Sequence, residues 1–539
     1  MGFVRANSAG VPKIRPVNLP SKCRVAWSTL TKDREANCIL DKKRKAMQAP
    51  PIDFDRVRTA FIGLDTEFTL ADGQKARRIY LDSAASNLMS KVAHDVQLRA
   101  LRHYANTHSH LHFGARLMTD LYHEAHEAVL DFVDASHDEY TAIFCGNGVT
   151  SALNRVAQLL ASKRPDRGTV ITTMMEHHAN DLPHRRHARK MVHIPLSWDD
   201  SGQVRAIDLS FLKRAIEAAG DDLNYVAITA ASNVTGAVTP IDEVVALARA
   251  AGALVVVDAA QSAAHHPLSL GASAPSSEES VDRAPDVVCL SGHKIYTPGS
   301  PGVIVARKHL FEGAEPHEVG GGIVSFVDAD RFTVVDKLPD REETGTPNIP
   351  GAIGLGATLR MLMHVGMDRV AKEEQRLTAY AIDAVSRVPD VMVYGSPDLE
   401  RIGVVTFNVM GLPHGLVSAI LNDYFGIAVR NECFCAQPFV RSLLGIADAS
   451  GRAPDSCLEP VCDPQAKPGM VRASLGLYNT EADIDALVKA LHAIVAHRDT
   501  YVARYDAVFD GSGDYTHHTY RPLDSEWITL DRAVQEALV

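Results

Sequence analysis

The sequence predicts an α/β protein built on a mostly parallel central sheet in a large domain, followed by a smaller α+β domain. Short β-branched apolar runs alternate with helical periods between about residues 80 and 340, and this pattern changes after about residue 352. The continuous apolar character of the runs indicates strands that are buried on both faces of the sheet. The expected strands cover residues 141–144, 169–172, 225–228, 254–257, 287–290 and 302–305.

Length and composition narrow the functional class. The chain has 539 residues, of which 46% are hydrophobic and 22% charged, a composition typical of globular proteins with more than one domain. A net charge of -11 would repel a polyanion, so no nucleic acid partner is expected. No apolar run reaches the length of a spanning helix, so no membrane partner is expected either. Eight cysteines in so long a chain fit a reducing compartment, and a cytoplasmic protein is predicted, with organellar targeting left open.

Changes in composition along the chain suggest its domain boundaries. After residue 352 we expect a long helical stretch, a strand over 403–408 and a final helix over 484–497. Segments 273–280 and 442–469 are rich in turn residues and predict irregular surface segments. The expected division is an irregular extension over 1–50, a large domain over 80–340, a small domain over 51–79 and 352–500, and a C-terminal tail over 501–539.

An acidic residue directly follows the fourth expected strand. Asp258 closes the run 254–257 and precedes Ala259-Ala260-Gln261. Ligands of open α/β sheets bind where the carboxyl ends of strands meet loops, so this carboxylate can address a ligand. Beside a pyridine nitrogen, it would keep the ring protonated and make it an electron sink. Taken alone, however, the run favours the alternative of an N-cap for the next helix.

A lysine follows the next strand in the segment Ser291-Gly292-His293-Lys294. A lysine at a strand end can lose its charge by desolvation and form an imine with an aldehyde. Taken alone, Lys294 would be read as a surface charge. Ser291 and His293 can bind phosphate, and the Pro- and Gly-rich turn over 297–302 fixes the loop, so the surroundings favour a functional lysine.

A glycine-rich turn over residues 145–150 precedes a segment with apolar residues at helical spacing. Such a turn at a helix N-terminus presents free N–H groups and the positive end of the helix dipole, which suits a phosphate. Its spacing is neither that of a Walker loop nor that of a dinucleotide fingerprint. The turn alone therefore does not identify a ligand.

Taken together, these segments resemble one protein family over about residues 80–495. The sequence is similar to the cysteine desulfurases and selenocysteine lyases of the class V aminotransferases, which are pyridoxal 5'-phosphate (PLP) enzymes with the fold type I architecture. The motifs that carry the resemblance are Tyr80-Leu81-Asp82-Ser83-Ala84-Ala85, Glu176-His177-His178-Ala179-Asn180, Ser232-Asn233-Val234-Thr235-Gly236, Val257-Asp258-Ala259-Ala260-Gln261, Ser291-Gly292-His293-Lys294, Gly345-Thr346-Pro347-Asn348 and Arg472-Ala473-Ser474-Leu475.

The resemblance implies PLP as the cofactor and assigns residues to it. Lys294 would be the Schiff-base lysine, Asp258 would pair with the pyridine nitrogen, and His177 would stack on the ring. Gln261 would bond the phenolic oxygen, and Asn233 would lie near that oxygen and the substrate. The phosphate would be held by Gly148, Val149, Thr150, Ser291 and His293.

Two further residues follow from the resemblance. Thr346 would reach the phosphate of a second subunit, which implies a homodimer. Arg472 matches the arginine that grips the substrate carboxylate, a bidentate task suited to a guanidinium group.

The resemblance also identifies a nucleophile. Family desulfurases carry a cysteine on a loop of the small domain, and Cys435, in the segment 426–438, falls on its position. The implied reaction takes sulfur from L-cysteine: Lys294 removes the α-proton, and the Cys435 thiolate attacks the substrate sulfur. Alanine and an enzyme persulfide would result, with a sulfur-acceptor protein as a further partner. Lys294, Cys435 and His177 are the expected catalytic residues.

The cysteine loop departs from the family pattern. Family members usually have a Gly-His or His-His pair before the cysteine, whereas this chain has Glu432, Cys433 and Phe434. An acid at Glu432 would disfavour a nearby thiolate. The alternative for Cys435 is a small hydrophobic residue in a relative with other chemistry. An aminotransferase, an epimerase or a C–S lyase that acts on a small amino acid therefore stays open.

A metal site is not expected. The thiols of Cys433, Cys435, Cys457 and Cys462 are close in sequence, but their C-x-C and C-x4-C spacings are not those of common zinc sites. A redox pair among them stays open. Four histidines earlier in the chain lie on a segment that resembles a family stretch of the form Asn-x-His-x-x-x-His and need no metal: His103, His108, His110 and His112.

Overall fold

The computed structural model describes residues 54–107, 109–271, 283–446, 468–508, 513–521 and 529–538. The chain divides into two compact units, residues 1–51 and 52–539, and only the second contains described residues. Several expectations lie outside the described residues: the extension over 1–50, the segment 273–280, most of the segment 442–469, and the side chains of His108, Cys457 and Cys462.

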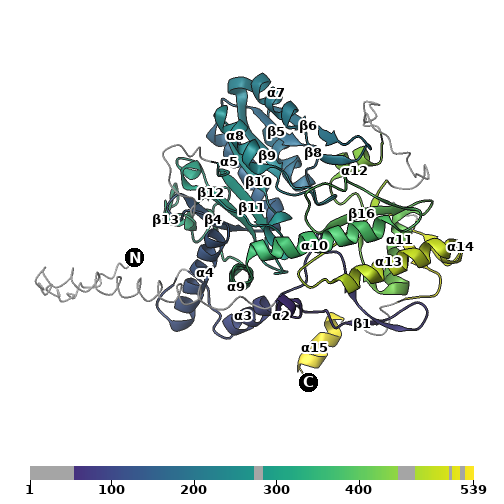
Figure 1. Cartoon of the computed structure of the whole chain (residues 1–539). Helices are drawn as coiled ribbons and strands as arrows, with labels where there is room; N and C mark the ends of the chain where they lie inside the picture. Colours follow the sequence, from purple (N-terminus) through teal and green to yellow (C-terminus); the bar gives the residue numbers. More distant parts are fainter. Residues whose placement is uncertain are drawn as a thin grey trace, which may run out of the picture. The chain divides into compact units, whose positions relative to one another are not determined.

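A seven-stranded sheet forms the centre of the larger core (Figure 1), with the strand order β4-β12-β11-β10-β9-β5-β6. From β11 to β6 the neighbouring strands are parallel, whereas β12 runs antiparallel to both β11 and β4. The predicted mostly parallel sheet is therefore confirmed, and β6 is a strand that the sequence pattern did not predict. The strands are β4 (Tyr140–Cys145), β5 (Thr169–Thr173), β6 (Lys190–Ile194), β9 (Leu223–Thr229), β10 (Leu254–Asp258), β11 (Val287–Ser291) and β12 (Gly302–Arg307).

The sheet is buried on both faces. In β10, Val255 and Val257 belong to one apolar cluster, and Val256 belongs to another. In β4, Phe144 and Ile143 are divided between the same two clusters. Because successive side chains of a strand point to opposite faces, a strand covered on both sides needs apolar residues at every position. This explains the continuous apolar runs in the sequence.

Helices supply the two coverings. The helix α5 (Gly148–Lys163) packs against β11 and β12 and contributes Leu153 and Val156 to one cluster. On the opposite face, the other cluster takes its residues from a larger set of helices. These are α3 (Lys91–Leu101), α4 (Phe113–Phe132), α7 (Leu209–Ala219), α8 (Ile241–Ala250) and α9 (Ile349–Val365).

A second apolar core surrounds a four-stranded antiparallel sheet with the order β15-β16-β19-β18. Phe407 of β16 and Val471 of β19 lie in this core with residues of three helices. The strand expected over 403–408 and the helix expected over 484–497 are observed as β16 and α13. The elements are β15 (Val391–Val393), β16 (Val404–Val409), β18 (Arg430–Glu432), β19 (Met470–Ser474), α10 (Met367–Ser386), α11 (His414–Phe425) and α13 (Glu481–Ala496).

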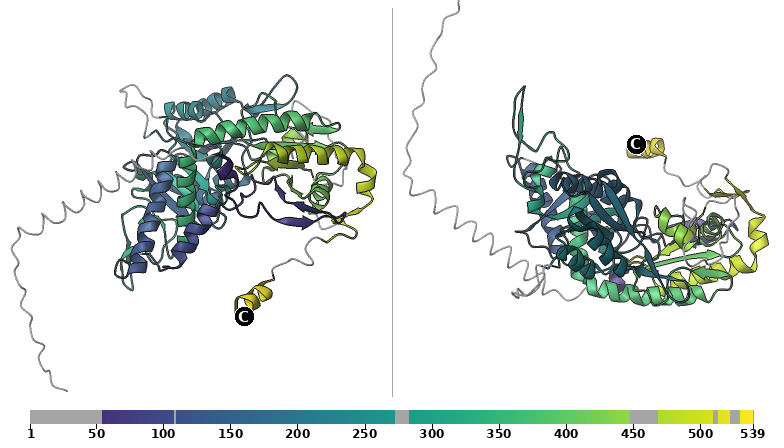
Figure 2. Two further views of the ribbon diagram at one scale, coloured as in Figure 1. Left: turned by 60° about the horizontal axis from the view of Figure 1, so that its bottom comes forward. Right: turned by 90° about the horizontal axis from the view of Figure 1, so that it is seen from above.

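The helix α10 belongs to both cores. Near its start, Val370 is part of the cluster beside the large sheet, whereas Leu377 and Val385 belong to the second core. The long helical stretch expected after residue 352 is thus two helices, α9 and α10. They are separated at Gly366, whose φ of 90° ends α9. The helices α10 and α13 pack side by side, green and yellow-green in Figures 1 and 2.

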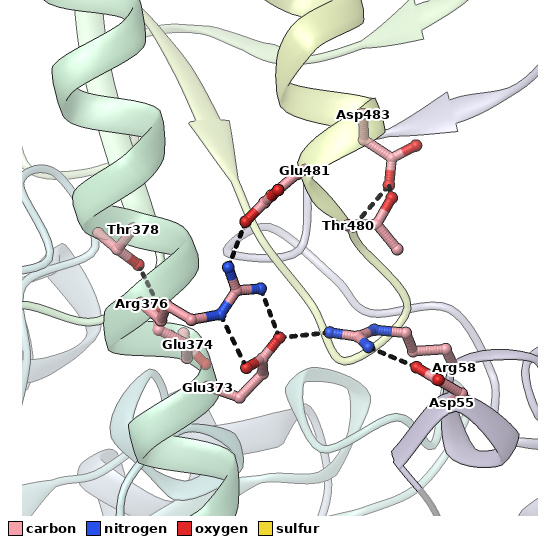
Figure 3. A network of polar contacts seen from close by, with 9 residues as sticks. All are labelled: Asp55, Arg58, Glu373, Glu374, Arg376, Thr378, Thr480, Glu481 and Asp483. Atoms are coloured by element: carbon pink, nitrogen blue, oxygen red, sulfur yellow. Dashed lines mark hydrogen bonds and ion pairs between the residues drawn. The ribbon is translucent and has the colours of Figure 1, made fainter.

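Charged side chains link α10 to neighbouring elements (Figure 3). Glu373 accepts a hydrogen bond from Arg58 of α2 at 2.5 Å and forms an ion pair with Arg376 at 2.9 Å. Arg376 also pairs with Glu481 of α13. Arg376 and Glu481 are exposed whereas Arg58 and Glu373 are half-buried, and the network ties α2, α10 and α13 together.

The C-terminal residues contain regular structure. Strands β20 and β21 form a hairpin, and Tyr505 of this hairpin is buried in the second core. Within the described ranges, no helix combines the length and the apolar character needed to cross a bilayer. The short elements are α2 (Phe54–Arg58), β1 (Glu67–Thr69), β2 (Lys75–Arg77), β3 (Ile79–Tyr80), α6 (Leu182–His187), β7 (Leu196–Trp198), β8 (Val204–Ile207), β13 (Val324–Val327), β14 (Phe332–Val334), β17 (Ile427–Ala428), α12 (Gln437–Leu443), α14 (Arg498–Val502), β20 (Tyr505–Ala507), β21 (Tyr515–His517) and α15 (Leu530–Leu538).

Candidate active site

The carboxyl ends of two adjacent parallel strands bring an acid and a base together. Asp258 ends β10 and lies opposite Cys289 of β11, and β11 leads directly into the short turn that carries Lys294. The Asp258 carboxylate is buried, and its Oδ1 accepts a hydrogen bond from the N–H of Ala260 at 2.9 Å. Burial raises the pKa of Asp258, while the Ala260 N–H and the charge of Lys294 act in the opposite direction. An aspartate here can therefore hold a proton on a bound ring nitrogen.

Lys294 has the properties of a reactive amine. Burial lowers the pKa of its side chain to about 8, although the charge of Asp258 opposes the shift. A sizeable fraction of the amine is therefore neutral near physiological pH, as an attack on an aldehyde requires. The turn is held in place by Asn87, whose Nδ2 donates to the Lys294 carbonyl at 2.7 Å and whose N–H donates to the His293 carbonyl.

His177 lies on the loop after β5, close enough to Lys294 to be affected by its charge. Its Nδ1 accepts a hydrogen bond from the N–H of Ala179 at 3.0 Å. Burial, reinforced by the positive charge of Lys294, lowers the pKa of His177 to about 3. The ring is therefore neutral, with its proton on Nε2. A neutral imidazole can stack on a heteroaromatic ring without adding charge.

A buried glutamate holds the His177 loop against the sheet. Glu176 accepts hydrogen bonds from the hydroxyl of Thr173 at 2.5 Å, the Nδ2 of Asn180 at 2.6 Å and the N–H of Thr229 at 3.1 Å. Burial raises the pKa of Glu176 to about 8. Thr229 lies directly opposite Asp258 in the sheet, so Glu176 fixes the His177 loop relative to the strand end that bears Asp258.

The N-terminus of α5 forms a cradle for an anion. Gly148 has a φ of 58°, and a Cβ atom at this position would lie 2.7 Å from the Ser291 Oγ and 3.7 Å from a carbon of the His293 ring. The N–H of Val149 points at the same Ser291 oxygen, at 3.4 Å. Burial lowers the pKa of His293 to about 4, so its ring is neutral. Thr150 is exposed on the first turn of the helix. The helix N-terminus thus meets the side chains of Ser291 and His293 at a position where a side chain on residue 148 would collide with Ser291. This arrangement suits a phosphate.

Two amides complete the floor of the site. Gln261 donates its Nε2 hydrogen bond to the Ala84 carbonyl at 2.8 Å. Asn233 donates its Nδ2 to the Phe434 carbonyl at 2.7 Å, and its buried Oδ1 has no partner among the described residues. A buried acceptor of this kind fits a ligand that brings a donor. PLP fits the groups described so far, which are the acid Asp258, the amine of Lys294, the neutral ring of His177, the anion cradle at α5 and the free acceptor of Asn233.

Arg472 of β19 adds a buried cation. Its Nη1 donates to the Asn233 carbonyl at 2.8 Å, and its Nη2 pairs with Asp82 at 3.4 Å. Burial lowers the pKa of Arg472 to about 10, so the group still carries its charge at neutral pH. Its Nε is buried without a partner in the described part of the chain. Arg472 therefore keeps hydrogen-bonding capacity for an incoming carboxylate.

The loop between β18 and α12 presents Cys435, whose side chain is exposed. Its carbonyl accepts a hydrogen bond from the N–H of His178 at 2.7 Å, and the Phe434 carbonyl is held by Asn233. The ring of Phe434, the residue before Cys435, is centred 4.7 Å from the Cζ of Arg472, so the loop lies beside the arginine of the site. The cysteine loop, the loop after β5 and the strand β19, which are distant in sequence, thus meet at one site.

The remaining candidates lie elsewhere or have structural roles. Thr346 is exposed, and its hydroxyl accepts a hydrogen bond from Asn106 at 3.2 Å. His112 caps α4, since its Nδ1 accepts from the N–H of Ala115 at 3.3 Å. Among the described residues, no group of three or more metal-ligating side chains gathers, and the pairing of Cys433 and Cys435 with the two later cysteines lies outside that range.

Sequence reasoning missed three residues of the site: Asp82, Glu176 and Phe434. Each lies within a segment that the sequence analysis names, but nothing in the sequence indicated the role of the individual residue. Asp82 reaches Arg472 because residues 81–83 run beside the end of β19. For Glu176 and Phe434, a position next to a predicted catalytic residue was the only available indication, and for Asp82 it was only membership of a motif that carries the resemblance.

Comparison with known proteins agrees with this geometry. The model of the family described as Aminotransferase class-V matches residues 79–487. The cysteine desulfurase of Escherichia coli O127:H6 is 32% identical over 421 residues, which cover 77% of this chain and 93% of that protein. The probable cysteine desulfurase of Halalkalibacterium halodurans is 33% identical over 420 residues, 77% of this chain and 92% of that protein.

Solved structures give the same result. The apo cysteine desulfurase from Thermococcus onnurineus NA1 superposes with a TM-score of 0.65 at 30% identity, covering 78% of this chain and 95% of that one. The S-sulfonic acid form of the cysteine desulfurase CsdA from Escherichia coli superposes with a TM-score of 0.66 at 28% identity, covering 83% and 99%. The similarity thus extends over the large sheet, the second core and the site between them.

Proposed function

The chain belongs to the class-V aminotransferase family and, within it, to the PLP-dependent cysteine desulfurases; from this premise we propose that it removes sulfur from L-cysteine through Cys435. The products are alanine and a persulfide on Cys435. The observation that carries the proposal is the position of the cysteine loop: it is anchored on His178 and Asn233, and its Phe434 ring stacks on Arg472.

Binding and proton transfer are assigned to three residues. Arg472 binds the substrate carboxylate, because its guanidinium group is buried and charged and its Nε–H has no partner among the described residues. When bound, PLP supplies an electron sink that stabilises negative charge at the substrate α-carbon. Lys294, whose pKa is lowered to about 8, takes the proton from that carbon. His177, neutral and protonated on Nε2, covers the reacting centre and excludes water.

Sulfur transfer is assigned to Cys435. Its thiolate attacks the sulfur of the substrate, so that a sulfur–sulfur bond forms as the bond between that sulfur and the β-carbon breaks. The electron pair of the broken bond stays on the β-carbon, which takes up one proton, and Lys294 returns a proton to the α-carbon to complete alanine. The outer sulfur remains on the enzyme as a persulfide, ready for an acceptor thiol.

Single-turnover reactions with L-cysteine test this assignment. Wild type should give one alanine and one persulfide per site, whereas Cys435→Ala should lose persulfide formation. Cys433→Ala is the matched control, since it removes a thiol from the same loop and should retain both products. If Cys435→Ala still forms alanine at the wild-type rate, desulfuration through this thiol is wrong and another class V reaction, such as C–S lysis, is favoured.

Partners and location complete the proposal. A homodimer is supported by the exposure of Thr346, whose hydroxyl accepts a bond from Asn106 and still has a proton to donate to the phosphate of a second subunit. A sulfur-acceptor protein is supported by the exposure of the Cys435 side chain. A cytoplasmic location fits a mechanism that needs a reduced thiol.

A further inference from the structure

Phe434 connects the cysteine loop to the arginine of the substrate site. The centre of its ring lies 4.7 Å from the Cζ of Arg472, and its side chain is 7% exposed. Its carbonyl accepts a hydrogen bond from Asn233 at 2.7 Å, while Arg472 donates to the carbonyl of that same Asn233 at 2.8 Å. Phe434, Asn233 and Arg472 therefore form a closed triangle in which each residue contacts the other two.

The backbone of this loop needs such an anchor. Glu432, Phe434 and Cys435 have φ angles of 86°, 52° and 54°. Positive φ angles are unfavourable for residues other than glycine, and such conformations persist only where the surroundings hold them in place. The Cys435 side chain is exposed and adds no packing. The anchors of the loop include the Phe434 contacts, the bond from the His178 N–H to the Cys435 carbonyl, and the bond from the Gln437 N–H to the His178 ring at 3.3 Å.

We propose that Phe434 is a positioning residue whose ring, stacked on Arg472, holds the Cys435 loop over the substrate site. The effect on persulfide formation rests on the proposed function, whereas the effect on the position of the loop does not. Without the ring, the three left-handed residues relax and the thiol leaves the site for part of the time. Arg472 keeps its bonds to Asn233 and Asp82, so the carboxylate site survives the change.

The variants are chosen to separate stacking from packing. Phe434→Leu keeps an apolar side chain and removes the ring, and Phe434→Tyr restores a ring. Phe439→Leu is the matched control, because Phe439 is also buried, lies at the start of α12 and belongs to the same apolar cluster. All variants are studied as full-length holoenzyme.

Two readouts follow the loop and the chemistry separately. The first is the rate at which iodoacetamide alkylates Cys435, measured by mass spectrometry on the tryptic peptide 431–441, with Cys433 in the same peptide distinguished by fragmentation. The second is the single-turnover rate of persulfide formation, compared with the dissociation constant of L-alanine. L-Alanine carries the carboxylate and the amine but no sulfur, so it reports on substrate binding independently of sulfur transfer.

In Phe434→Leu, alkylation of Cys435 should rise and persulfide formation should fall, each by about threefold to fivefold, because losing one desolvated cation–π contact shifts the ratio of displaced to docked loop by about tenfold to thirtyfold. The dissociation constant of L-alanine should stay within about twofold of wild type, and Phe434→Tyr should restore both rates. Equal effects in Phe434→Leu and Phe439→Leu, or unchanged alkylation in Phe434→Leu, would overturn the proposal. Because alkylation needs no turnover, a protein that fails to desulfurate L-cysteine would refute the proposed function and still test the loop.

Discussion

Replacing Gly148 by alanine is expected to weaken PLP binding by about thirtyfold to several hundredfold, a loss of about 2–4 kcal/mol. Two contributions make up this loss. A residue with a Cβ atom at a φ of 58° costs about 1–2 kcal/mol. The new methyl group would also lie 2.7 Å from the Ser291 Oγ, and relieving that contact costs about 1–2 kcal/mol more. The first turn of α5 relieves both by tilting away, and cofactor binding has to reverse the tilt.

The assay is a titration of the cofactor-free protein with PLP, followed by absorption, together with urea unfolding. Gly220→Ala is the matched control, because Gly220 has a φ of 54° but a Cβ atom there meets nothing within 4 Å. It should lower stability and leave PLP affinity unchanged. The reasoning about the cradle is wrong if Gly148→Ala binds PLP as tightly as wild type, or if both variants weaken binding equally.

Two further predictions concern Glu176 and Arg472. Burial raises the pKa of Glu176 from 4.5 to about 8, so its contribution to stability is present below about pH 4.5 and is lost as pH rises through 8. Urea denaturation should therefore show that the unfolding free energy of wild type, minus that of Glu176→Gln, is larger at pH 5 than at pH 8. The opposite trend would contradict a protonated Glu176 in the folded protein. Arg472→Lys replaces a planar fork by a point charge, so the KM for L-cysteine should rise about tenfold or more while PLP affinity stays the same; an unchanged KM would remove Arg472 from the substrate site.

The central residues of the site could be predicted because their positions at strand ends made them candidates and the family resemblance assigned their roles. Asp258 and Lys294 each follow an apolar run, and the topology of a parallel sheet brings such ends together. The strand β6 escaped prediction because it lies at an edge, with the exposed Lys190 and the half-buried His193 interrupting the apolar pattern. Its pairing with β5 is a tertiary effect that no local pattern carries.

The roles of Glu176 and Phe434 could not be read from the sequence for a related reason. Glu176 is defined by a bond to Thr229, 53 residues away, and by complete burial. Phe434 was recognised only as a departure from the family pattern, because the direction of its ring depends on a left-handed backbone that sequence does not specify. Chemistry at strand ends is local in sequence, whereas the supports of that chemistry are not.

The helix α10 has a consequence for how the molecule unfolds. Since Val370 is packed in one core and Leu377 in the other, neither core can melt without fraying a helix that the other requires. Glu374, between them, accepts hydrogen bonds from His265 of the large sheet's loops and from the N–H of Gly403 before β16. The two cores are therefore expected to lose their structure in one cooperative transition, as a single folding unit, and the site between them disappears at once rather than in stages.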